Sequence, residues 1–137
     1  MIVIILADEG YQSESALRHY LANHHNPNNI VHLFHANDSA AQPMIIRSAI
    51  ETRENNLKAK MENIINEMGV RVAPIFKWVR VTRSEDVATE ALKYADETDA
   101  GLLVCGSRNL TTIGSMIFGS VSKTILYQSK CPVLLHK

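Results

Sequence analysis

The segment 106–122 contains the residue types best suited to holding a phosphate group. It follows an apolar run, 102–105, that is typical of a buried strand, and Gly119 and Ser120 begin a helical pattern near its end. Gly106 has no side chain to block a ligand that approaches the backbone. The N–H groups of such a loop can point into one concavity, and a helix start adds partial positive charge. The segment therefore predicts a phosphate-binding loop in a nucleotide-binding protein.

Two widespread phosphate-binding motifs do not occur in the chain. The P-loop pattern Gly-x-x-x-x-Gly-Lys-[Ser/Thr] is absent, and so is the dinucleotide pattern Gly-x-Gly-x-x-Gly. An alternative without a ligand stays open, in which Gly106 is a turn residue and Ser120 caps a helix.

Two charged side chains are candidates for the same site. Asp8 follows the first apolar run, and its carboxylate can accept hydrogen bonds from a ribose hydroxyl or an adenine amino group. The alternative for Asp8 is a local Asx turn or a helix cap. Arg108 can neutralise phosphate charge, and its alternative is an exposed loop arginine.

Five apolar runs alternate with helical patterns along the chain. The runs are typical of buried strands and cover residues 2–7, 30–36, 70–81, 102–105 and 132–135. We expect Ser13 to cap the first helix, Ser84 to start the third and Ser120 to start the last. Gly69 is expected at the C′ position of the second helix. Pro74 interrupts the third run, which favours a place near a sheet edge.

This alternation predicts an α/β fold with a doubly wound open sheet of five parallel strands and helices on both faces. We expect the strand order 3-2-1-4-5, within a single domain of residues 1–137. In such sheets ligands bind beyond the carboxyl ends of the strands, where the strand order reverses. Neighbouring first and fourth strands would place Asp8 and Gly106 in one crevice.

Composition limits the classes of partner. Fourteen basic residues balance fourteen acidic ones, which argues against a nucleic-acid or anionic-membrane surface. The apolar run 2–7 is far shorter than the roughly 20 residues that cross a bilayer, and no leader pattern surrounds it. Cys105 and Cys131 do not make a disulfide framework, so we expect a reducing, cytoplasmic compartment.

Metal binding and catalysis receive little support from the residues. His32 and His35 fall on opposite faces of their predicted strand and cannot share one metal ion. Cys105 ends a predicted buried strand without an evident base. We therefore assign no metal site and no catalytic residue, and whether the protein is an enzyme stays open.

The loop residues carry a resemblance to a known family. Gly106, Gly119 and Ser120 match Gly-x-x-Gly followed by nine residues and Gly-[Ser/Thr], and Asn109 stands in place of the second glycine. With a first strand ending in Asp8, this pattern resembles the nucleotide loop of the universal stress protein family over the full length of the chain. Asparagine is among the residues that best tolerate a positive φ, so the loop geometry can survive this replacement.

The resemblance implies a site for each part of an adenine nucleotide. Ala7 and Asp8 would lie by the adenosine, and Ala36 against the adenine. The ribose and phosphates would be surrounded by Cys105, Gly106, Asn109, Gly119, Ser120, Val121 and Ser122, with Arg108 near the phosphate charge.

The resemblance also implies a function and a partner. The expected ligand is ATP, with AMP and ADP as alternatives and Mg²⁺ beside a triphosphate. The protein would act as a nucleotide-dependent stress-response or signalling module with at most slow ATP hydrolysis, and would form a homodimer through its last strand. The alternative is a dimeric interaction module of the same fold that uses no nucleotide.

Overall fold

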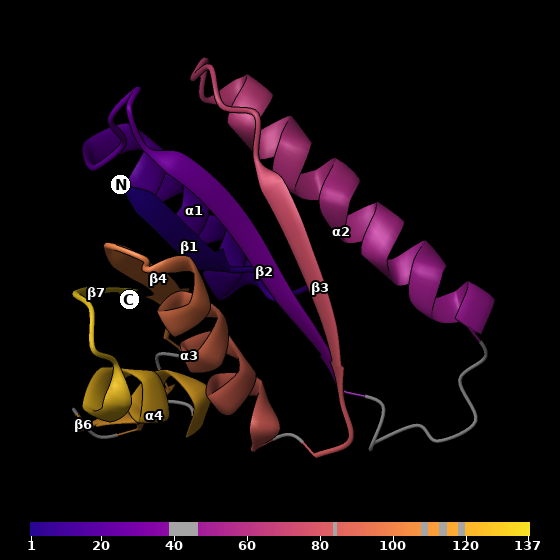
Figure 1. Cartoon of the computed structure of the whole chain (residues 1–137), viewed down its shortest axis with the longest axis vertical. Helices are drawn as coiled ribbons and strands as arrows, with labels where there is room; N and C mark the ends of the chain where they lie inside the picture. Colours follow the sequence, from indigo (N-terminus) through magenta and orange to yellow (C-terminus); the bar gives the residue numbers. More distant parts are fainter. Residues whose placement is uncertain (39–46, 84, 108–109, 113–114, 118–119) are drawn as a thin grey trace.

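A twisted five-stranded sheet organises the chain (Figure 1). The computed structural model describes residues 1–38, 47–83, 85–107, 110–112, 115–117 and 120–137. The elements follow in the order β1 (Ile2–Leu6), α1 (Tyr11–Asn23), β2 (Ile30–Asp38), α2 (Arg47–Glu67), β3 (Ile75–Val81), α3 (Asp86–Thr98), β4 (Leu102–Gly106), β5 (Leu110–Thr112), β6 (Ser115–Ile117), α4 (Ser120–Gln128) and β7 (Val133–His136).

The sheet has the order β3-β2-β1-β4-β7, and its strands pair in parallel. The predicted α/β fold and strand order are therefore confirmed. The chain moves outward from β1 to β3 on one side and then returns to place β4 on the other side of β1. The carboxyl ends of β1 and β4 stand next to each other at this reversal.

The third strand is shorter than the sequence predicts. The run 70–81 contains a strand only from Ile75, directly after Pro74. Proline has no N–H to donate to the ladder, so pairing begins beyond it, and β3 lies at an edge of the sheet as expected.

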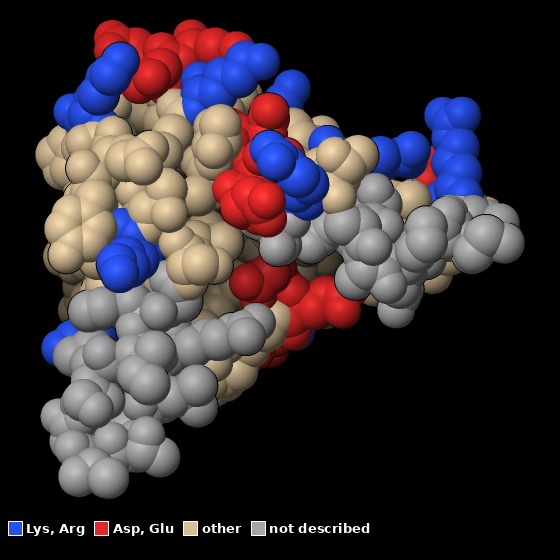
Figure 2. Space-filling view, turned by 90° about the horizontal axis from the view of Figure 1, so that it is seen from below, with Lys and Arg blue, Asp and Glu red and all other residues tan. Residues whose placement is uncertain are grey.

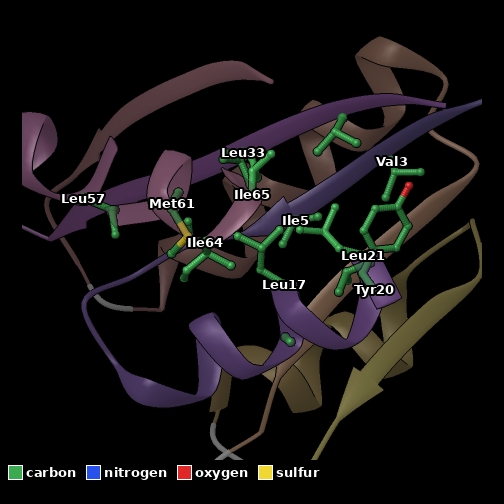
Figure 3. Packing of buried hydrophobic residues seen from close by; sticks show 14 residues of the cluster. Val3, Ile5, Leu17, Tyr20, Leu21, Leu33, Leu57, Met61, Ile64 and Ile65 are labelled. Carbon is green, nitrogen blue, oxygen red and sulfur yellow. The ribbon is translucent and has the colours of Figure 1, made fainter. Parts of the chain in front are cut away.

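Alternating strand residues fill a core on each face of the sheet. Odd-numbered residues of β1, such as Val3 and Ile5, pack with Leu17 and Tyr20 of α1 and with Met61 of α2 (Figure 3). The opposite core lies beneath α3 and α4 and contains Ile4, Phe34, Ala91, Leu103 and Ile125. Figure 1 shows α3 in front of the sheet and α1 behind it, as a doubly wound sheet requires.

The start of α1 differs from the prediction, and the predicted start of the third helix lies outside the described residues. Ser13 does not cap α1: Gly10 occupies the N-cap position without a side-chain hydrogen bond, and Ser13 is buried in the first turn. Its hydroxyl instead accepts a hydrogen bond from Asp8 N at 3.0 Å and lies 3.3 Å from Leu6 O, to which it donates. The predicted start at Ser84 lies outside the described residues. Gly69 has φ +66°, which confirms its C′ role after α2.

A short antiparallel pair interrupts the segment that the sequence predicts as loop. Residues 110–112 form β5 and pair with residues 115–117 of β6. Strands of three residues each are too short for a periodic pattern to reveal. Among the described helices, none is long and apolar enough to cross a membrane.

Protonation of a buried histidine should make the fold acid-sensitive. His32 is 8% exposed, its Nδ1 lies 2.6 Å from Tyr94 Oη, and burial lowers the pKa of its imidazole. The unfolded chain then binds a proton more readily than the folded one as pH falls below about 6.5, so stability declines there and is unaffected at higher pH.

We expect the free energy of unfolding in urea to fall between pH 7.5 and pH 5.5, and to fall less in His32→Gln. The control is His24→Gln, which replaces an exposed histidine. Its free energy of unfolding should fall by the same amount as that of the wild type over this pH range. An equal fall in the free energy of unfolding in His32→Gln and wild type would show that protonation of His32 does not cause the acid sensitivity.

Candidate functional site

A pocket of about 320 Å³ opens at the carboxyl ends of β1, β2 and β4, beside the start of α4. Every candidate residue that the structure describes lines this pocket: Ala7, Asp8, Ala36, Cys105, Gly106, Ser120, Val121 and Ser122. The remaining candidates, Arg108, Asn109 and Gly119, lie outside the described residues. The strand-order reversal thus brings together side chains that are more than a hundred positions apart in sequence.

The connection from β1 to α1 forms one wall and is tightly hydrogen-bonded. Ala7 N donates to Phe34 O at 2.8 Å, which ties the end of β1 to β2. Gly10 N donates to Asp8 Oδ1 at 2.6 Å, so Asp8 forms the Asx turn that the sequence left as an alternative. A carboxylate has several acceptor positions, and the turn accounts for one oxygen while the exposed side chain still lines the pocket.

Six further residues line the pocket that sequence reasoning did not select: Leu6, Gln12, Ser13, Phe34, His35 and Val87. His35 Nδ1 lies 2.8 Å from Ala7 O and donates to it, so this ring joins β2 to the wall formed by Asp8. Gln12 and Ser13 belong to the first turn of α1. Their role depends on how α1 lies across β4, a contact that no sequence pattern reports. His35 was missed because strand alternation places its side chain on the face opposite to that of Ala36.

At Gly106 the backbone of α1 comes very near to β4. A Cβ at this position would overlap the backbone of Gln12, lying 2.7 Å from its carbonyl carbon. Backbone atoms of a helix cannot move aside as a flexible side chain can. The packing of α1 on β4 therefore requires a glycine here whether or not a ligand approaches, which adds a structural reason to the one expected from the sequence.

The other wall contains the start of α4 and the end of β4. Ser120 is exposed and Ser122 is buried, and the first N–H groups of α4 lack partners within the helix. Helix starts of this kind favour anionic groups. Burial raises the pKa of the Cys105 thiol to about 11, so this sulfur is protonated and weakly nucleophilic at neutral pH.

The charges around the site are mixed in sign. On the face seen in Figure 2, the described acidic and basic side chains lie close together instead of forming separate areas. Among the described residues that line the pocket, Asp8 is the one aspartate, and glutamate, lysine and arginine do not occur. Within the part of the chain that the structure describes, no group of three or more histidine, cysteine, aspartate or glutamate side chains is arranged to hold a metal ion.

Replacing Gly106 tests whether packing requires this glycine. We expect Gly106→Ala to lower the free energy of unfolding of the ligand-free protein by about 1–3 kcal/mol, because the new methyl group overpacks against a helix backbone. The matched control is Gly101→Ala in the turn before β4, where the three atoms nearest to the new Cβ all belong to the side chain of Met1, so we expect a smaller loss. Urea denaturation measures both, and an unchanged stability in Gly106→Ala would show that packing does not demand glycine.

Comparison with known proteins gives one family match over the whole chain. The model of the Universal stress protein family matches residues 1–137. Universal stress protein YxiE from Bacillus subtilis (strain 168) is 35% identical over 69 residues, which cover 50% of this chain and 43% of that protein. The matched segment therefore spans less than half the length of this relative.

Solved structures share the fold at low sequence identity. A universal stress protein from Archaeoglobus fulgidus in complex with dAMP has a TM-score of 0.71 at 20% identity, covering 99% of this chain and 96% of that chain. A universal stress protein family protein from Arabidopsis thaliana with AMP bound has a TM-score of 0.67 at 16% identity, covering 100% of this chain and 91% of that chain. Similarity at this level establishes the fold. Which ligand this chain binds has to be argued from the residues of its own pocket.

Proposed function

Because the chain belongs to the universal stress protein family, we propose that it binds an adenine nucleotide in the pocket between β1, β4 and α4. The observation that carries this proposal is the convergence of all described candidate residues on that one pocket. Bound nucleotide would make the protein a nucleotide-dependent stress-response or signalling module. The dAMP and AMP complexes of the two structural relatives support an adenine nucleotide as the ligand class.

The pocket offers complementary chemistry at its two ends. Asp8 supplies a carboxylate that can accept hydrogen bonds from a ribose hydroxyl or the adenine amino group, with Ala7 and Ala36 as small apolar neighbours. At the other end, Ser120, Ser122 and the start of α4 supply donors and partial positive charge for phosphate. We place the adenosine at the first end and the phosphates at the second.

ATP is the ligand we propose, with AMP and ADP binding at the same place and Mg²⁺ accompanying the triphosphate. Hydrolysis would be slow at most. The protonated Cys105 thiol supports this view, because it offers neither a base nor a nucleophile near the phosphate end.

Calorimetric titration with ATP, ADP and AMP, with and without Mg²⁺, tests the ligand directly. Analysis of nucleotide released from denatured protein provides a second, independent measurement. A nucleotide-free preparation that gives no heat with any of the three would favour the alternative function, an interaction module of the same fold.

The carboxylate of Asp8 can be tested with a neighbouring control. Asp8→Asn keeps an oxygen to accept from Gly10 N but removes the negative charge, and we expect affinity for AMP to fall about tenfold, the effect of losing one good hydrogen bond. Glu9→Gln removes the same charge from the same loop at an exposed residue outside the pocket lining, and its affinity should match wild type. Equal effects of the two substitutions would mean that general charge, not contact, sets the affinity.

We also propose that two copies associate through β7. This strand ends the sheet, and its four residues are only partly buried in the single chain. Leu103 N donates to Pro132 O and Ser107 N to His136 O, so even-numbered residues of β7 bond to β4. The odd-numbered Val133 and Leu135 consequently direct their backbone groups to the open edge, where a second strand can pair.

Removing the N–H group of Val133 tests pairing between two copies without removing any bond between β7 and β4. Val133→Pro removes an N–H group that faces the open edge and leaves the bonds to β4 in place, so we expect the dimer to dissociate while the circular-dichroism spectrum is retained. Val133→Thr keeps the N–H group and should remain dimeric. Light scattering coupled to size-exclusion chromatography measures the mass; a Val133→Pro protein of unchanged mass would overturn the proposed interface.

A further inference from the structure

Three histidines come together where α1 passes β7. The rings of His19 and His136 are stacked, with centroids 4.7 Å apart and planes inclined by 27°, and the ring of His24 lies 5.2 Å from that of His19. His19 belongs to α1 and His136 is the last residue of β7, so the stacked pair joins two elements far apart in sequence. Figure 3 shows β7, in yellow, running beside α1.

The hydrogen bonds around His19 suit a neutral ring. Asn23 Nδ2 lies 3.2 Å from His19 Nδ1 and 3.1 Å from His19 O. An amide nitrogen only donates, so the ring nitrogen that faces it must accept, and this is possible only when Nδ1 carries no proton. Protonation of Nδ1 would turn two donors toward each other.

His136 is held from the other side by a hydroxyl. Ser15 Oγ lies 2.9 Å from His136 Nε2, and a hydroxyl can either donate to a neutral ring or accept from a charged one. Ser15 therefore tolerates both protonation states. The stacked rings, in contrast, favour the uncharged state, because two imidazolium ions at this separation repel each other.

The surrounding charged groups do not relieve that repulsion. On α1, Arg18 forms an ion pair with Glu67 at 2.8 Å, and Glu14 forms one with Lys60 at 2.7 Å. Among the described residues, no ion pair joins His19 or His136 to a carboxylate. The neighbouring strand β4 carries no aspartate, glutamate, lysine or arginine between Leu102 and Gly106. Burial, and then the charge on His19, lower the pKa of His136.

The end of β7 also supports the pocket. His136 is paired with Gly106, and its carbonyl oxygen accepts a hydrogen bond from Ser107 N at 2.8 Å. Gly106 lines the pocket, and Ser15 lies within one turn of Gln12, which lines it as well. The histidine pair thus joins β7 and α1 next to residues that line the pocket.

We propose that His19 and His136 form a pH-sensitive clamp, which holds the end of β7 on α1 while the stacked rings are uncharged and releases it when acid charges both of them. Release loosens the Gly106 side of the pocket and lowers its affinity for nucleotide. This second consequence rests on the proposed nucleotide function, whereas the release of β7 does not.

Hydrogen exchange tests the clamp without any ligand. After correction for the intrinsic pH dependence of exchange, amides at the end of β7 should lose about tenfold more protection between pH 7.5 and pH 5.5 than amides of β1. His19→Gln should retain protection at pH 7.5 and lose this acid sensitivity, and His136→Gln should do likewise. His25→Gln is the matched control, since His25 bonds to Tyr20 away from β7 and should behave as wild type. Equal acid sensitivity in wild type and His19→Gln would overturn the clamp.

Affinity for AMP supplies the second measurement. Wild-type affinity should weaken more than that of His19→Gln between pH 7.5 and pH 5.5, and this comparison cancels the titration of the phosphate itself. Absence of AMP binding at both pH values would count against the nucleotide function and leave the exchange result to decide the clamp. Retained binding with the same pH dependence in both proteins would refute the coupling to the pocket.

Discussion

The approach of the α1 backbone to the end of β4 is the constraint on which the site depends. At Gly106 there is no space for a Cβ, because the carbonyl group of Gln12 occupies it. This contact sets how deeply the first turn of α1 enters the carboxyl edge of the sheet. Gln12 and Ser13, in that turn, and Asp8, just before it, all line the pocket.

Polar contacts then hold the short β1–α1 connection in place. The Ser13 hydroxyl bridges Asp8 N and Leu6 O, and Asp8 closes a turn onto Gly10. A buried serine that satisfies two backbone groups costs little and stiffens the loop. The wall on which Asp8 stands is therefore organised before any ligand arrives, which reduces the entropy that binding must overcome.

The described histidines occupy three different kinds of environment. His32 lies in the core against Tyr94, His35 ties β2 to Ala7 at the pocket, and His136 stacks on His19 at the β7 side. Burial lowers the pKa of both His32 and His136. The same physical effect, burial, thus acts on a histidine in the core and on a histidine paired with Gly106 at the edge of the pocket.

Sequence patterns predicted much of the fold and the chemistry of the site. Continuous apolar runs separated by helical patterns are enough to predict parallel strands covered on both faces, since each strand must bury both sides. They could not predict that pairing starts only at Ile75, or that residues 110–117 contain a strand pair. Nor could they identify Ser13 as a bridging residue instead of a cap, because that role is defined by the neighbours of its hydroxyl in space.

By itself, the sequence determined the order of the helices and of the strands of the main sheet, the glycine at position 106 and the polar residues available at the strand ends, because these follow from local composition and period. Only the tertiary structure decided that Gly106 faces Gln12, that His35 and Gln12 join the pocket, and that His19 meets His136. Such contacts depend on where helices settle on the sheet, which is governed by side-chain packing across long sequence separations.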